Sequence, residues 1–249
     1  MVEETIRLTR EQNSAKPFEY MVANLGFPLS EFGQTQVTAA GINETKILNG
    51  IRIREAAVKY GAVVQTMRNR GVSPNWEQVR TYMNVGVEDV LICADPDERV
   101  ENDNWVHAIA EVMQANPRIA WCSLMMREQE PLLADPRFKW TEKVIAGHRV
   151  YIMHTYGFNW AQGGFSGKFL DSVGGVQAME KAPIYGWIES AATQHFGMRW
   201  DFAIMADMYV EHIASPPLYG EWKQWVCSPA VINEGKQIDF EQWLLENKV

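Results

Sequence analysis

The sequence predicts an α/β fold in which helices cover a mostly parallel central sheet. In the first half of the chain, short apolar runs typical of buried strands alternate with longer segments whose apolar residues recur at helical spacing. Turn-forming Gly and Pro residues separate many of these segments. Such alternation is typical of strand–helix–strand units, which build parallel sheets with helices on their faces.

The elements expected in the first half follow one another in a regular order. Gly61 closes the first helix, Ser73 is the expected N-cap of the second with Pro74 at its first position, and Pro117 stops the third. The expected strands cover residues 18–27, 62–67, 87–95 and 118–126, and the expected helices cover residues 45–61, 73–86 and 102–117.

The second half has a different pattern and predicts a mixed part of the sheet. Residues 142–156 have the pattern of a β-hairpin that turns near Gly147, and residues 198–212 contain a long strand. With no internal repeat or low-complexity linker, we expect residues 1–249 to form a single domain. We expect an α/β half of the kind that binds nucleotides at about 18–125 and a mixed half at about 126–249, which would face the second substrate, the acceptor.

Composition restricts the classes of function. A formal net charge of −8 argues against non-specific binding to nucleic acid or to an anionic membrane, because both need a positive surface. No apolar run is long enough to span a membrane, and the N-terminus lacks the apolar core of a secretion signal. The three cysteines are widely spaced and fit a reducing, cytoplasmic setting, where we expect them to be small buried residues.

The strand expected at 87–95 ends in a cluster of carboxylates. Residues 86–103 contain seven acids and one base, and Asp95 and Asp97 follow the strand directly. Ligands bind beyond the carboxyl ends of strands in α/β sheets, and crowded carboxylates repel unless a cation shares them. A divalent metal such as Mg²⁺ or Mn²⁺ with a phosphate-bearing substrate fits this pattern. The same acids could instead favour the dipole of the helix that begins near Asn104.

The segment from 56 to 98, AAVKYGAVVQTMRNRGVSPNWEQVRTYMNVGVEDVLICADPDE, resembles the donor-binding half of GT-A fold glycosyltransferases, particularly family 2. The features that carry the resemblance are the YGA strand at 60–62, the NRG turn at 69–71, Asn75 near a helix start, and Asp95 with Asp97. Three more follow in the family's order: residues 103–124 resemble the next helix and strand, GGFSGKFLDSVGGV resembles a glycine-rich element, and MYVEHIAS resembles a strand ending in His.

This resemblance, which covers about 48–215, implies a metal-dependent, inverting sugar transfer from a nucleotide-diphosphate sugar. It places Asp95 near the donor ribose and the metal, Asp97 on the metal, and His212 as the third protein ligand. Two carboxylates and a neutral imidazole suit Mn²⁺ better than Mg²⁺. Without the family order, His212 would be a hydrogen-bonded strand end.

The resemblance places the catalytic base downstream of the glycine-rich element. The nearest match is Glu189 in YGWIESAATQHFG, where Ser190 stands in place of the family's Asp, and Glu180 is the second candidate. Glu189 is equally consistent with an acid in the first turn of a helix, which favours the helix dipole.

Other residues are candidates for donor and acceptor binding. The family's Asp-rich nucleobase turn is absent, and Asn43 or Glu44 would replace its contact. Arg70, one of six bases between 51 and 80, and Asn75 would approach the donor. Gly163, Gly164 and Trp187 would lie on the acceptor side; Trp160 and Trp222 are further aromatic candidates, although most Trp residues belong to cores.

Two functions follow from these patterns. The first is a glycosyltransferase whose acceptor is a glycan, a protein, a lipid-linked intermediate or a modified DNA base. The alternative is a non-catalytic module that binds a nucleotide or sugar on the same scaffold. Asp95, Asp97 and His212 favour the enzyme, and the departure at Ser190 favours the binding module.

Overall fold

A computed structural model of the chain shows an α/β fold. Contacts divide the chain into two compact units, Met1–Glu211 and His212–Val249. The description below concerns the first unit and, of the second, only His212, which is the last residue of a strand. The structure describes residues 2–24, 44–66, 72–94, 98–127, 130–134, 136, 139–154, 162–176 and 199–212.

The described residues form five α-helices, one short 3₁₀ helix and nine strands. None of these helices is long and apolar enough to cross a lipid bilayer. In chain order the elements are α1 (Val2–Gln12), β1 (Met21–Asn24), α3 (Glu44–Lys59), β2 (Val63–Thr66), α4 (Val72–Tyr82), β3 (Val90–Cys93), β4 (Glu98–Val100), α5 (Trp105–Ala115), β5 (Ile119–Met126), η1 (Glu130–Ala134), β6 (Trp140–Ile145), β7 (His148–Met153), β8 (Gly163–Ser166), α6 (Gly167–Val173) and β9 (Asp201–His212).

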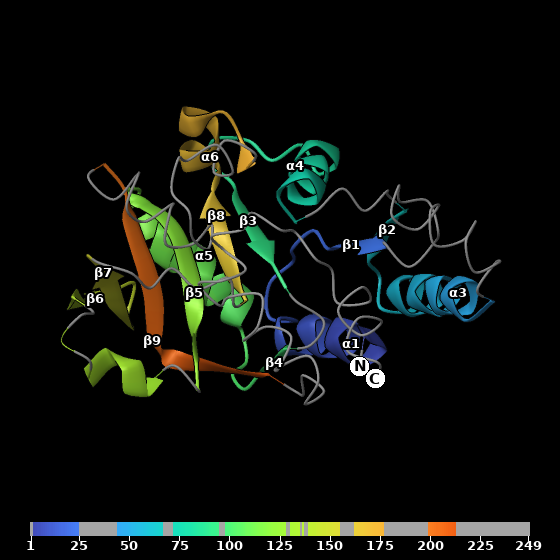
Figure 1. Ribbon diagram of the computed structural model, residues 1–249, viewed down its shortest axis with the longest axis horizontal. Helices are drawn as coiled ribbons and strands as arrows, with labels where there is room; N and C mark the ends of the chain where they lie inside the picture. The colour runs from blue at the N-terminus through green and yellow to red at the C-terminus, as the bar shows by residue number, and fades with distance from the viewer. Residues whose placement is uncertain are drawn as a thin grey trace, which may run out of the picture. The chain divides into compact units, whose positions relative to one another are not determined.

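The main sheet has seven strands and is mixed, so the prediction of a mostly parallel sheet was wrong (Figure 1). Its order is β3-β8-β5-β9-β7-β6, and β4 pairs with the end of β9. Strand β8 is antiparallel to both β3 and β5, and β7 is antiparallel to both β6 and β9. Parallel pairing occurs between β5 and β9, and between β1 and β2 in a separate two-stranded sheet.

The physical reason for this error is that hydrophobic periodicity carries no information about strand direction. Strands β3 and β5 run in the same direction, as the alternation in the first half predicts. Both are antiparallel to β8. Strand β8 comes from the second half and lies between these two strands. Neighbours in a sheet therefore come from distant parts of the sequence, which no local pattern records.

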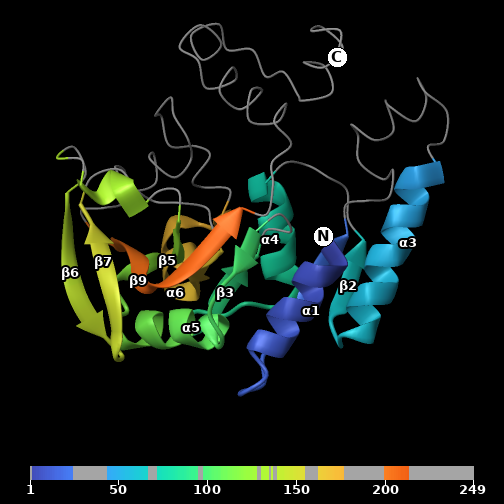
Figure 2. The ribbon, with the colours of Figure 1, turned by 90° about the horizontal axis from the view of Figure 1, so that it is seen from below.

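Strand β5 lies at the centre of the core, with all eight residues buried. Its alternate side chains point to opposite faces. Cys122, Leu124 and Met126 belong to the cluster that includes α5, and Trp121 belongs to the cluster that includes α6. Helices therefore cover both faces of the sheet, as the sequence predicted, and α5 lies along one of them (Figure 2).

Helix α5 packs through one stripe and is joined to α1 at its start. Its six buried residues recur at helical spacing from Trp105 to Met113. The backbone N–H of Val106, in the first turn, donates to the side chain of Asn13, and the N–H of Asn104 donates to the carbonyl of Gln12. Gln12 at the end of α1, and Asn13 directly after it, thus accept hydrogen bonds from backbone N–H groups at the start of α5.

Most predicted elements occur, with shorter bounds. Helix α4 begins at Val72, so Ser73 lies within its first turn and does not precede the helix. Cys122 is buried as expected, whereas Cys93 is half-buried; Cys227 lies outside the described residues. Sequence analysis did not predict α1, β4, η1 or the strand–helix form of the glycine-rich element.

The close packing of β8 generates a stability prediction. A Cβ atom on Gly163 would lie 2.5 Å from Trp121 Cζ2 and 2.8 Å from the Cys122 carbonyl oxygen. We expect Gly163→Ala to lower the free energy of unfolding by about 1 to 3 kcal/mol, as overpacking does, measured by denaturant unfolding. Gly86→Ala is the control, because its Cβ would meet only the end of the Asp89 side chain, at 3.3 Å. Equal losses in the two variants would contradict the prediction.

Candidate functional site

The carboxyl ends of β3, β5 and β9 lie at one edge of the sheet. Strands β3 and β5 are both antiparallel to β8, and β5 is parallel to β9, so all three run in the same direction. Ligands of α/β sheets bind at such an edge. Strand β3 ends at Cys93, Ala94 follows it, and β4 begins at Glu98. The predicted ligands Asp95 and Asp97 lie outside the described residues, between these two points.

Strand β4 runs back along the end of β9. The N–H of Glu101 donates to the Tyr209 carbonyl at 3.0 Å, and Arg99 forms an ion pair with Glu211 at 2.8 Å. Later residues of β4 therefore face earlier residues of β9, which is the pattern of antiparallel strands. Arg99 stands two positions after Asp97 in the sequence, and Glu211 directly precedes His212. The pairing therefore joins the sequence neighbours of two predicted metal ligands.

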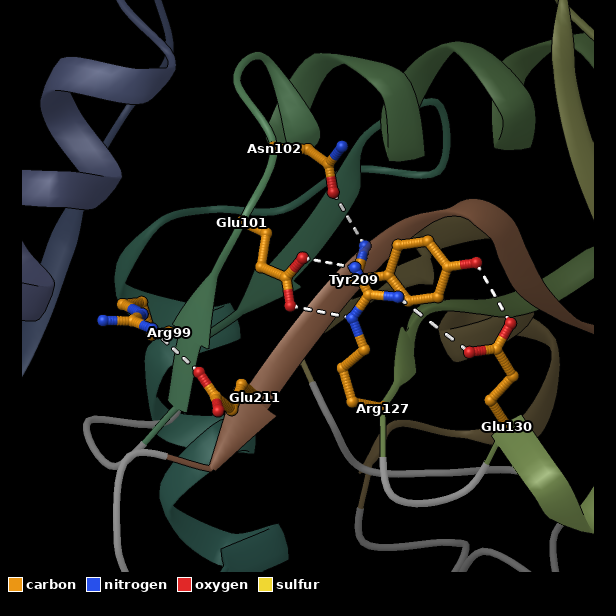
Figure 3. A network of polar contacts seen from close by, with 7 residues as sticks. All are labelled: Arg99, Glu101, Asn102, Arg127, Glu130, Tyr209 and Glu211. Atoms are coloured by element: carbon orange, nitrogen blue, oxygen red, sulfur yellow. Dashed lines mark hydrogen bonds and ion pairs between the residues drawn. The ribbon is translucent and has the colours of Figure 1, made fainter.

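Arg127, directly after β5, connects the same segments (Figure 3). Its Nε and Nη2 donate to the two carboxylate oxygens of Glu101 at 2.9 and 2.6 Å, and its guanidinium lies 3.5 Å from the centroid of the Tyr209 ring. Glu130 accepts a hydrogen bond from the Tyr209 hydroxyl at 3.2 Å and lies 3.9 Å from Arg127 Nη1. We call Arg127, Glu101, Tyr209 and Glu130 the Arg127 network.

The network shifts the ionisation of its members. The hydrogen bond from Arg127 lowers the pKa of Glu101. Burial raises the pKa of Tyr209, and its hydrogen bond to Glu130 adds to this effect. At neutral pH, Glu101 is therefore a carboxylate and Tyr209 a neutral phenol, which are the forms that the contacts with Arg127 and Glu130 require.

Glu98 is a buried acid at the start of β4. It is 5 % exposed, and its Oε2 accepts a hydrogen bond from the backbone N–H of Gln162 at 2.9 Å. A buried carboxylate is tolerated when such donors replace water. Gln162 directly precedes β8, which lies between β3 and β5. This hydrogen bond therefore connects Glu98 at the start of β4 to the start of β8.

The structure gives the glycine-rich element a packing role. Gly163 faces Trp121, and a Cβ on Gly164 would meet Val90 at 2.9 Å and Ile109 at 3.1 Å. Both glycines are buried inside β8. These close contacts leave no room for a side chain, which explains why glycine occupies both positions. The predicted contact of the two glycines with an acceptor stays a prediction.

The Val-Gly-Gly end of this element closes α6. Gly174 and Gly175 have φ of 86° and 99°, a conformation that favours glycine. The next residue, Val176, donates its backbone N–H to Glu77 Oε2 of α4 at 2.7 Å. A Cβ on Gly175 would lie 2.5 Å from that same oxygen, so the glycine also makes room for the carboxylate.

The remaining predicted residues are placed only in part. Glu44 is the first residue of α3, Asn75 lies in the first turn of α4, and His212 is the last residue of β9. Within the described ranges no group of three or more His, Cys, Asp or Glu residues is arranged to hold a metal ion. Asn43, Arg70, Trp160, Glu180, Trp187, Glu189 and Trp222 lie outside the described residues.

Sequence reasoning missed the Arg127 network. Its members are scattered between positions 101 and 209 and belong to no local motif. The acid at Glu101 was noticed only as part of the acidic cluster. Only the pairing of β4 and β5 with β9 brings these side chains together.

The lowered pKa of Glu101 predicts a pH-dependent contribution to stability. Its folded pKa is below the ordinary value of 4.5, so the stabilising effect is present above that value and is lost as the pH falls through the folded pKa. We expect Glu101→Gln to be less stable than the parent near neutral pH, and the difference to shrink under acid conditions. Denaturant unfolding of both proteins from about pH 7 to about pH 3 measures this. A difference that stays constant with pH would refute it.

A comparison of the sequence with models of known protein families found no match, and a search of curated proteins found none. The resemblance to family 2 glycosyltransferases therefore rests on the ordered motifs in the sequence itself.

Proposed function

We propose that this chain is a metal-dependent glycosyltransferase of the GT-A type, which moves a sugar from a nucleotide-diphosphate sugar to an acceptor hydroxyl. The observation that carries the proposal is the pairing of β4 with the end of β9. The exposed Arg99–Glu211 ion pair lies between two segments whose sequence neighbours include Asp97 and His212. Without such pairing, residues so far apart in sequence would have no reason to meet.

The sheet supports a donor site at the same edge. Strands β3, β5 and β9 share one direction, and Asp95 follows the carboxyl end of β3. The parallel pair β1 and β2 packs against α3, whose first residue is Glu44. Ligand sites at the carboxyl ends of strands are typical of nucleotide-binding α/β folds. In this proposal Asn43 or Glu44 contacts the nucleobase, and Arg70 and Asn75 approach the donor.

The proposed metal ligands form a chemically consistent set. Asp95, Asp97 and His212 offer two carboxylates and one imidazole, which suit Mn²⁺ and, less well, Mg²⁺. When bound, the cation neutralises negative charge on the leaving diphosphate. This set leaves coordination positions for diphosphate oxygens, as a catalytic site requires.

Glu189 is the proposed general base. Its carboxylate accepts the proton of the acceptor hydroxyl while the acceptor oxygen bonds to the anomeric carbon. The bond from that carbon to the diphosphate oxygen breaks, and the nucleoside diphosphate leaves with the electron pair. Attack opposite the leaving group inverts the anomeric centre. This proposal assigns Gly163, Gly164 and Trp187 to the acceptor side, and the acceptor is a glycan, a protein, a lipid-linked intermediate or a modified DNA base.

The central test is metal-dependent binding and turnover of a donor. A screen of nucleoside-diphosphate sugars, read by release of the nucleoside diphosphate, should identify a donor that is used with Mn²⁺ and not with a chelator. Asp97→Ala and His212→Ala should each weaken metal-dependent donor binding in calorimetry. The double variant should lose clearly less than the sum of the two losses, since both residues belong to one site.

Two results would count against this assignment. Additive losses, or a His212→Ala protein that binds the donor normally, would remove His212 from the metal site. Circular dichroism of each variant serves as the control, since a native spectrum shows that the loss does not come from unfolding.

A second prediction separates an enzyme from a binding module. Glu189→Gln should lower kcat by about 10²-fold or more and leave donor affinity nearly unchanged, because only general-base catalysis is lost. Glu180→Gln tests the second candidate base and should keep most of the turnover, whereas the reverse pattern would make Glu180 the base. A parent protein that binds a donor without transferring its sugar would instead favour the binding module.

A further inference from the structure

Strand β9 has two parts that differ in their neighbours. From Phe202 to Met205 it pairs with β5 on one side and with β7 on the other, and these four residues are buried. Pairing with β7 ends at Met205. From Tyr209 on, the strand pairs with β5 again, and β4 is its other neighbour. We call Tyr209–Glu211 the β9 end.

A bulge joins the two parts of β9. The paired positions advance by one residue along β5 while they pass from Met205 to Tyr209 along β9, which leaves three extra residues in β9. In the bulge, the Asp207 side chain continues the contact with β7. Its Oδ2 accepts a hydrogen bond from the backbone N–H of Arg149 at 3.4 Å and lies 3.5 Å from Nδ1 of His148. Its Oδ1 is buried and accepts no hydrogen bond from any described residue, which costs free energy and makes the bulge a weak point of the strand.

Exposed polar contacts hold the β9 end. The N–H of Glu101 donates to the Tyr209 carbonyl, and the N–H of Arg127 donates to the Val210 carbonyl at 3.1 Å. The side chain of Arg127 adds the forked contact with Glu101 and covers the Tyr209 ring (Figure 3). Water competes with such contacts, because the side chains of Arg127 and Glu211 are 46 % and 48 % exposed. Within the β9 end only Val210 is buried.

We propose that the β9 end opens and closes as a unit of its own, with the bulge as its hinge and Arg127 as its latch. Opening breaks the bonds of the β9 end to β4 and β5 and leaves the pairing of Phe202–Met205 intact. The inference involves no bound metal or sugar, so it stands apart from the proposed function. Because β3, β5 and β9 end at one edge of the sheet, the motion changes the shape of the edge at which ligands of α/β sheets bind.

Burial explains why the two parts of β9 open at different free energies. Segments with few buried apolar contacts and exposed hydrogen bonds open locally, whereas core strands open only with the whole protein. Four consecutive buried residues hold the central part, and one holds the β9 end. Arg127 binds Glu101 through a fork and stacks on Tyr209, so one side chain closes the contacts of β4, β5 and β9 together. Lysine lacks the planar fork that both contacts use.

Amide hydrogen exchange of the whole chain, followed by nuclear magnetic resonance, tests the hinge. Three amides report on the β9 end: those of Glu101 and Arg127, which donate to it, and that of Tyr209, which belongs to it. The amide of Leu124, which donates to the residue before β8 at 2.9 Å, reports on the sheet centre. We expect the first three protection factors to agree within about threefold and to lie about 100-fold or more below that of Leu124. Along β9, the change from slow to fast exchange should fall at the bulge.

A conservative variant tests the latch. Arg127→Lys keeps the positive charge and loses the forked contact. We expect the protection factors of the Glu101 and Tyr209 amides to fall by about tenfold and that of Leu124 to stay unchanged. Arg7→Lys is the matched control, because it alters another exposed Arg–Glu pair, within α1, and should leave all four protection factors at their parent values.

The outcomes decide the hinge and the latch separately. Exchange of the three reporting amides as slow as that of Leu124, or at three unrelated rates, would overturn the hinge. Parent-like protection in Arg127→Lys, or an equal loss in Arg7→Lys, would overturn the latch. Equal losses at all four amides in Arg127→Lys would also overturn it, since the arginine would then act on global stability. Each of these results leaves the proposed function as it stands, because no measurement uses a metal or a donor.

Discussion

Strand β5 is buried along its whole length, and this burial constrains the elements around it. Trp121 points to one face, where its ring stacks on Trp76 of α4 at 6.3 Å and contacts Phe165 at 4.3 Å between ring centroids. Cys122 and Leu124 point to the other face, where α5 packs. Burial on both faces requires apolar partners on each side, so the positions of α4, α5 and β8 all depend on this strand.

The close contacts of β8 show how this constraint selects residues. Gly163 lies against the Trp121 ring, and Gly164 lies against Val90 and Ile109. Larger residues at either place would displace the ring or the helix, because interiors are close-packed. The same glycines form part of a motif that the sequence suggested for acceptor binding. Close packing alone explains why glycine occupies positions 163 and 164, whether or not these residues also contact an acceptor.

At the candidate site, the fold brings polar residues to the end of a sheet that is otherwise apolar. The carboxylate of Glu98 accepts a hydrogen bond from the backbone N–H of Gln162. The carboxylate of Glu101 accepts two hydrogen bonds from the guanidinium of Arg127. A bulge in β9 separates the strand's long central pairing from its last residues. Bulges of this kind are common next to functional sites, where they redirect side chains. In the sequence, Asp97 directly precedes β4, and His212 is the last residue of β9.

The sequence by itself determined the α/β class, the order of most helices and strands, and the acidic cluster after β3, because each depends on local periodicity and composition. It also identified Cys122 as buried, since an apolar strand surrounds it. The direction of β8, the short strand β4, and the meeting of Arg127 with Glu101 and Tyr209 were decided only by the tertiary structure. The reason is that strand pairing joins segments far apart in the chain, and the free energy that selects those partners comes from contacts that no local stretch of sequence contains.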